Sequence, residues 1–117
     1  DPERLDRALL CTGFPYDVRE HPEGPAGLIA RFLGLVQGIR RLGSAALDLA
    51  YTASGRYDGY FEFNLKPWDV AAGALICSEA GAVATQIDGA PYDTSVIDVG
   101  SSPGRGSGFH GLRCAWL

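Results

Sequence analysis

The stretch from Tyr57 to Gly81 constrains the fold of this chain more than any other, because a strand pattern, a tight turn and a helix pattern follow one another there without interruption. Its first part alternates in polarity, which predicts a strand with two different faces. One face carries Tyr57, Gly59, Phe61 and Phe63, and the other carries Asp58, Tyr60 and Glu62. After a turn at Pro67, Asp69 is a favoured N-cap because its carboxylate accepts amide hydrogens of the first helical turn. We predict that Asp69 opens a helix that ends at Gly81.

Two carboxylates lie at neighbouring element ends in this stretch. Glu62 is near the end of the predicted strand, and Asp69 follows seven residues later at the start of the predicted helix. Carboxylate oxygens bind hard cations and accept hydrogen bonds from hydroxyl groups. The pair therefore predicts a site for a cation or a polyol. Two simpler interpretations stay open, with Asp69 only capping its helix and Glu62 only facing solvent.

Strand and helix patterns alternate along the rest of the chain. Ser44 is a good N-cap for the second of the predicted helices, and Gly55 ends that helix. This alternation predicts an α/β fold with a layered, largely parallel sheet flanked by helices. The predicted strands are Ala8–Thr12, Ile39–Leu42, Ala82–Ile87 and Ser95–Val99, and the predicted helices are Ala26–Gln37 and Ala45–Ser54.

Composition excludes several classes of protein. The net charge of −4 and the lack of a Lys/Arg stripe argue against a nucleic-acid partner, and the pair Arg40-Arg41 is better explained as a strand-edge or interface feature. The three cysteines show no metal-ligand spacing, which argues against zinc and favours a reducing, cytoplasmic environment. Because no apolar run approaches the ~20 residues that span a bilayer, we expect no membrane partner.

Several short motifs carry a resemblance to a known family. They are Gly43-Ser44-Ala45-Ala46, the segment WDVAAG at Trp68–Gly73, and Glu79-Ala80-Gly81. Together with the spacing from Ser44 to Glu62 to Asp69, this pattern resembles the C-terminal signature of the inositol monophosphatase family, from about Leu10 to Asp93. The resemblance implies that residues 1–100 form the C-terminal half of an αβαβα sugar-phosphatase fold. Residues 101–117 are a Gly/Ser-rich tail atypical of the family, either a truncated end or a flexible extension.

The resemblance also implies roles for individual residues. Asp69 matches a ligand of catalytic Mg²⁺, and Glu62 matches a carboxylate that contacts a substrate hydroxyl. Gly43, Ser44 and Ala45 match the loop that lies against the substrate, a role that is compatible with N-capping by Ser44. The loop after Thr12 is expected near the substrate, whereas Trp68 is expected to pack the turn against the core. No catalytic residue is assigned within this chain.

The family's other metal motifs, G-E-E and D-P-x-D-G-T, do not occur in this sequence. The resemblance therefore implies Mg²⁺-dependent hydrolysis of inositol monophosphate or a similar polyol phosphate, with this chain as the substrate wall and a missing N-terminal half as its partner. We expect the chain alone to be inactive. Alternatives are an inactive remnant that serves as an interaction or scaffold domain, with homodimerisation, or half of a nucleotide-bisphosphate or histidinol-phosphate phosphatase.

Overall fold

The structure is a computed structural model that describes residues 4–63, 65–86 and 111–115. A short 3₁₀ turn, η1 (Leu5–Arg7), precedes the first strand. The elements that follow are β1 (Leu9–Thr12), α1 (Glu23–Leu33), β2 (Gly38–Arg40), α2 (Ala45–Ala53), β3 (Gly59–Phe63), α3 (Pro67–Glu79), β4 (Val83–Gln86) and β5 (Gly111–Ala115).

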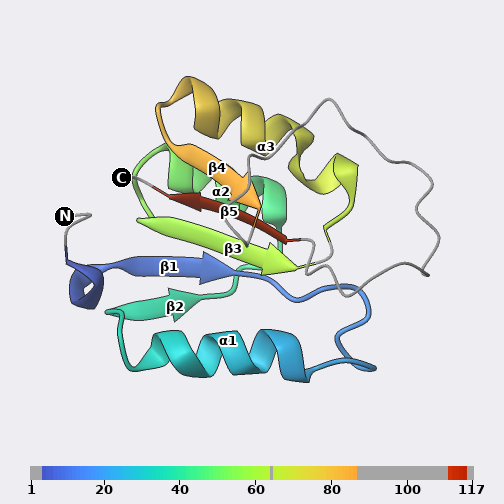
Figure 1. Cartoon of the computed structure of the whole chain (residues 1–117). Coiled ribbons are helices and arrows are strands. Elements are labelled where there is room, and N and C mark those ends of the chain that lie inside the picture. The colour runs from blue at the N-terminus through green and yellow to red at the C-terminus, as the bar shows by residue number, and fades with distance from the viewer. Residues whose placement is uncertain (1–3, 64, 87–110, 116–117) are drawn as a thin grey trace.

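One sheet organises the described part of the chain, with strand order β2-β1-β3-β5-β4. β1 pairs in parallel with both β2 and β3, whereas β5 pairs antiparallel with β3 and with β4 (Figure 1). The predicted α/β fold with a largely parallel sheet is therefore confirmed. β5 itself was not predicted, because it lies within the segment 101–117 that we interpreted as a tail. The predicted strand Ser95–Val99 lies outside the described residues.

Helices cover both faces of the sheet. In Figure 1, α1 lies below the sheet, α3 lies above it, and α2 is partly hidden behind β4 and β5. Successive strand residues point to opposite faces, so Leu10 and Phe61 pack toward α1 while Cys11 and Tyr60 pack toward α2 and α3. The alternation predicted for β3 is correct. The face expected to be polar is nevertheless covered, because two helices pack on it.

Several element boundaries differ from those predicted. α1 begins at Glu23, which places Pro25 in the first turn, where a helix tolerates proline because the amides there have no partner within the helix. The helix ends at Leu33, before Gly34. α3 begins at Pro67 with Lys66 as N-cap, so the prediction that Asp69 caps this helix is wrong. Proline is favoured at the first helical position, and Asp69 instead lies one turn in, where its carboxylate accepts the Lys66 amide hydrogen at 3.1 Å.

Other local predictions are confirmed. The hydroxyl of Ser44 caps α2 by accepting a hydrogen bond from the Leu47 amide at 3.3 Å. Gly55 and Gly81 follow the ends of α2 and α3 with φ of +79° and +88°, a conformation that glycine adopts without strain. None of the helices among the described residues is both long and apolar enough to span a membrane.

Candidate active site

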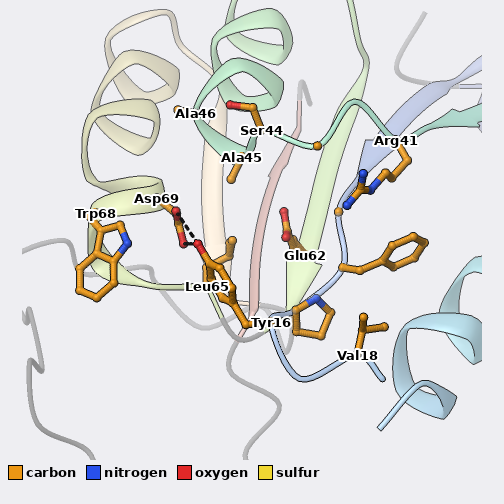
Figure 2. A pocket seen from close by; sticks show the side chains of 14 residues that line it. Tyr16, Val18, Arg41, Ser44, Ala45, Ala46, Glu62, Leu65, Trp68 and Asp69 are labelled. Atoms are coloured by element: carbon orange, nitrogen blue, oxygen red, sulfur yellow. Dashed lines mark hydrogen bonds between the residues drawn. The ribbon is translucent and has the colours of Figure 1, made fainter. Parts of the chain in front are cut away.

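A pocket of about 480 Å³ lies at one edge of the sheet. Because β1 and β3 run in parallel, their carboxyl ends meet there, and open α/β sheets bind ligands at that edge. The loop after β1 and the N-terminal turns of α2 and α3 complete the wall (Figure 2). All five residues predicted from the sequence line this one pocket: Gly43, Ser44, Ala45, Glu62 and Asp69.

Glu62 is buried at the base of the pocket wall, with 7% of its surface exposed. The Tyr60 hydroxyl donates a hydrogen bond to its carboxylate at 2.5 Å, and Gly13 lies so close that a Cβ there would be 2.5 Å from Cδ of Glu62. Burial raises the pKa of Glu62, while the hydrogen bond from Tyr60 opposes that effect. The interpretation of Glu62 as a solvent-facing strand residue is therefore wrong.

Asp69 stands on the opposite side of the pocket, on α3. Its carboxylate is held by the Lys66 amide, and the hydroxyl of Tyr16 lies 3.4 Å from each carboxylate oxygen (Figure 2). The negative charge of Asp69 raises the pKa of Tyr16. From the third position of α3 the carboxylate thus stabilises the helix start and also faces the pocket, and this helix contact is compatible with the ligand interpretation.

The N-terminus of α2 forms a third side of the pocket. Gly43 adopts φ of +93°, which turns the chain so that Ser44 begins the helix. The first amide groups of a helix present partial positive charge to a ligand oxygen. This geometry suits the predicted contact of Gly43, Ser44 and Ala45 with a substrate, while the contact itself stays a prediction.

A divalent metal would find one suitable ligand in this pocket. Asp69 offers a half-exposed carboxylate, and hard cations such as Mg²⁺ prefer oxygen ligands. Among the residues that the structure describes, however, no group of three acidic, histidine or cysteine side chains is close enough to hold a metal ion. The donor set fits one corner of a metal site rather than a complete one.

Two pocket residues differ from their predicted roles. Arg41 was interpreted as a strand-edge or interface residue, but it lies beyond β2 and lines the pocket, with its guanidinium 5.4 Å from the centre of the Phe14 ring. Trp68 was expected to pack against the core, yet it is 72% exposed at the pocket rim. The loop that carries Phe14 and Tyr16 was correctly expected near the pocket, although no role was assigned to either side chain.

Asp48 is the residue near the pocket that sequence reasoning missed. It lies on α2 with none of its surface exposed, and neither carboxylate oxygen has a hydrogen-bond partner. Burial raises its pKa to about 6, although the charge of Arg41 opposes that shift. The sequence analysis predicted only an apolar helix packed between layers. The presence of one charged residue, Asp48, in that apolar pattern was the signal that could have identified it.

Comparison with known proteins agrees with this geometry. The family model described as the inositol monophosphatase family matches residues 1–112. The chain belongs to this family. Its relatives include a protein of Neisseria meningitidis serogroup B named putative Nus factor SuhB, 49% identical over 85 residues, and Nus factor SuhB of Vibrio cholerae, 47% identical over 100 residues. These matches cover 73% and 85% of this chain.

Solved structures show the same fold. Inositol monophosphatase from Anabaena superposes with a TM-score of 0.78 at 38% identity, and Mycobacterium tuberculosis SuhB with a TM-score of 0.72 at 40% identity. Each covers 96% of this chain, but the chain covers only 39% and 37% of those structures. Against the Neisseria and Vibrio relatives the shares are 33% and 38%. The chain therefore spans little more than a third of the length of its relatives.

Proposed function

We propose that this chain forms the substrate wall of a Mg²⁺-dependent phosphomonoesterase that acts on inositol monophosphate or a similar polyol phosphate. Glu62 accepts hydrogen bonds from substrate hydroxyls, and the α2 N-terminus at Gly43, Ser44 and Ala45 meets a ligand oxygen. Asp69 supplies one metal ligand. When bound, the metal would supply Lewis acidity toward the phosphate.

One observation carries this proposal: two carboxylates and a helix N-terminus, drawn from three different elements, line the same pocket. A polyol phosphate has both hydroxyl donors and an anionic group, so it can use all three. Neutral hydroxyls suit Glu62 in its carboxylate form, because a carboxylate only accepts hydrogen bonds. The remaining metal ligands belong, in this proposal, to the part of the family's length that this chain does not span.

The test is Mg²⁺-dependent phosphate release from inositol 1-phosphate. The chain is assayed alone and after mixing with a polypeptide that carries the G-E-E and D-P-x-D-G-T motifs of the family. We expect no release by the chain alone and release by the mixture. Asp69→Asn in the mixture should lower the rate by at least about 100-fold, since even groups that only orient a metal ligand are worth 10–100-fold.

Glu79→Gln is the matched control, because Glu79 is an exposed carboxylate at the far end of the same helix. It should leave the rate unchanged. A mixture that forms a complex but releases no phosphate would refute the proposal, and equal effects of the two substitutions would refute the assignment of Asp69. A panel that adds nucleotide bisphosphates and histidinol phosphate identifies the substrate class.

A second candidate is an interaction domain without catalysis, including a homodimer. It is favoured by the exposed apolar side chains of α3, where Trp68, Leu75 and Ile76 are 72%, 60% and 47% exposed, and by the name Nus factor that several relatives carry. Sedimentation of the chain alone tests self-association. Dimerisation without phosphate release in the mixture would favour this candidate.

A further inference from the structure

The carboxyl group of Glu62 occupies space that glycine at position 13 leaves open. A Cβ at Gly13 would lie 2.5 Å from both Cδ and Oε1 of Glu62, and the three atoms nearest to it all belong to that carboxyl group. Gly13 does not have the positive φ that Gly43 has, so its backbone conformation is open to other residues. The requirement for glycine at position 13 therefore comes from the space that Glu62 fills.

The pairing of β1 with β3 brings these two residues together. Thr12 ends β1 opposite Phe61 in the parallel register, so the residues that follow, Gly13 and Glu62, lie side by side. The Thr12 hydroxyl donates a hydrogen bond to the Phe61 carbonyl oxygen at 2.7 Å, which ties the two chain segments at this point. Because side chains alternate between the faces of a sheet, positions 13 and 62 project to the same side. The Glu62 carboxyl thus lies where a side chain at position 13 would project.

The second contact that fixes this carboxyl group is with Tyr60. The Tyr60 hydroxyl donates to Oε2 of Glu62 at 2.5 Å, and both residues are buried. Burial raises the pKa of Tyr60 far above its usual range, so the hydroxyl stays protonated and remains a donor. Among the described residues, the fully buried side-chain oxygens without a partner belong to Asp48. Oε1 of Glu62 receives no hydrogen bond from the described chain and is left accessible from the pocket.

We propose that Gly13 and Tyr60 are positioning residues that aim Glu62 at a substrate hydroxyl. Gly13 leaves the room in which the carboxyl group lies, Tyr60 engages Oε2, and Oε1 is the acceptor for the substrate. This inference rests on the proposed function, because it assigns the substrate hydroxyl to one oxygen of Glu62. A carboxylate already fixed by two contacts loses little freedom when it binds, which favours a substrate with a hydroxyl at that point over one without it.

The first experiment tests the contact between Gly13 and Glu62 and needs no enzymatic activity. Gly13→Ala should lower the midpoint temperature of thermal unfolding, Tm, by at least about 4 °C, because its methyl group overpacks a buried site. In a Glu62→Ala background the methyl group enters the space that the carboxyl has left, so the loss should shrink to less than about 2 °C. Gly27→Ala is the control, since its methyl group would meet no atom within 4 Å, and it should not lower Tm in either background.

The second experiment tests the contact between Tyr60 and Glu62, again in this chain alone. The carbon-13 resonance of the Glu62 carboxyl group is followed by NMR as the pH is varied. The hydrogen bond from Tyr60 lowers the pKa of Glu62, so Tyr60→Phe should raise that pKa by about one pH unit. Tyr51→Phe is the matched control, because Tyr51 lies on α2 and does not line the pocket. It should leave the Glu62 pKa unchanged.

The third experiment measures how the active mixture discriminates between substrates. Inositol 1-phosphate is compared with analogues that each lack one ring hydroxyl. The parent should disfavour one analogue by at least about 10-fold in kcat/KM, as expected for a lost hydrogen bond to a charged group. Gly13→Ala and Tyr60→Phe should reduce this ratio toward that of Glu62→Ala, mainly by raising KM for inositol 1-phosphate, and Gly27→Ala should keep it. A purely structural role would lower the rates for all substrates alike.

Other outcomes overturn the proposal. Equal losses from Gly13→Ala in both backgrounds would mean that the methyl group meets atoms other than the Glu62 carboxyl. If Gly13→Ala does not fold, folding of the double variant supports the contact, and failure of the double variant overturns it. An unchanged Glu62 pKa in Tyr60→Phe, or full discrimination in both variants, overturns the positioning role. Inactivity of the parent mixture would count against the proposed function alone, and the first two experiments would still decide how Glu62 is held.

Discussion

The two faces of the sheet differ in the kinds of side chain that they bury. The α1 face has an apolar core cluster, with Ala8, Leu10 and Phe61 packed against partly buried side chains of α1 and β2, and buried Thr12 follows Leu10 on the same face. The face beneath α2 and α3 also has an apolar cluster, but three polar side chains are buried on that side in the described chain: Asp48, Thr52 and Glu62. The carboxylates that face the pocket belong to this second side. The comparison teaches that the α1 face contributes mainly apolar packing to stability. The face beneath α2 and α3 also buries carboxyl groups, and this burial raises their pKa values.

The largest expected effect is on the apolar face. Phe61→Ala removes a ring that is 94% buried and packs against Phe32 with ring centres 5.1 Å apart. Removing a buried aromatic side chain lowers the free energy of unfolding by about 3–5 kcal/mol. Urea denaturation followed by circular dichroism measures this change. A loss below about 1 kcal/mol would mean that the α1 face is not the stabilising one.

The next effect is a pH dependence of stability that arises from the face beneath α2 and α3. The pKa of Asp48 is raised from 3.8 to about 6 in the folded chain, so the folded state binds more protons than the unfolded state between these values. Stability should therefore fall as the pH rises from about 4 to about 6, and the penalty should be complete above that window. It corresponds to about 2–3 kcal/mol, at 1.36 kcal/mol for each pH unit.

Asp48→Asn should remove the part of this fall that Asp48 causes, while the smaller fall expected from the raised pKa of Glu62 remains. Thermal unfolding at several pH values checks the prediction, with the variant expected to be more stable than the parent above about pH 6 and similar to it near pH 4. Parallel pH profiles for the two proteins would contradict it. Phe61→Leu serves as a reference, since it lowers stability without adding or removing a titratable group.

The smallest effect compares glycines in helices on the two faces. A Cβ at Gly73 in α3 would lie 2.7 Å from Cβ of Leu49, whereas one at Gly27 in α1 would meet no atom within 4 Å. Gly73→Ala should lower the free energy of unfolding by roughly 1–2 kcal/mol, because overpacking outweighs the gain in helix propensity. Gly27→Ala should raise it by roughly 0.5–1 kcal/mol. Equal effects in denaturant melts would show that the α2–α3 contact is no tighter than the surface of α1.

Sequence reasoning succeeded where structure is decided locally. Ser44 caps α2 as expected, because an N-cap depends on a hydroxyl and the amides of the next turn. The residues with predicted roles were brought to one pocket, since parallel strands end at the same edge of the sheet. The misplaced start of α3 was also a local matter, in which Pro67 at the first helical position outweighed Asp69 as a cap.

Sequence reasoning failed where contacts are distant along the chain. β5 inserts antiparallel between β3 and β4, and its segment shows a pattern too short to separate from its Gly-rich surroundings. Arg41 looked like an edge residue until the loop carrying Phe14 came to lie beneath its guanidinium. Trp68 looked like a core residue, but it is 72% exposed. Only tertiary packing decides which apolar side chains at the start of a helix are covered.

The sequence by itself determined the family, the α/β alternation and the identity of the residues around the pocket, because these depend on periodicity, caps and short motifs. Only the tertiary structure decided that Glu62 is buried against Gly13 with the Tyr60 hydroxyl beside it, and that the Asp48 carboxyl on α2 is buried without a hydrogen-bond partner. The physical reason is that a carboxyl group's charge depends on desolvation and on neighbours from other elements, and neither is written in the residues next to it in the chain.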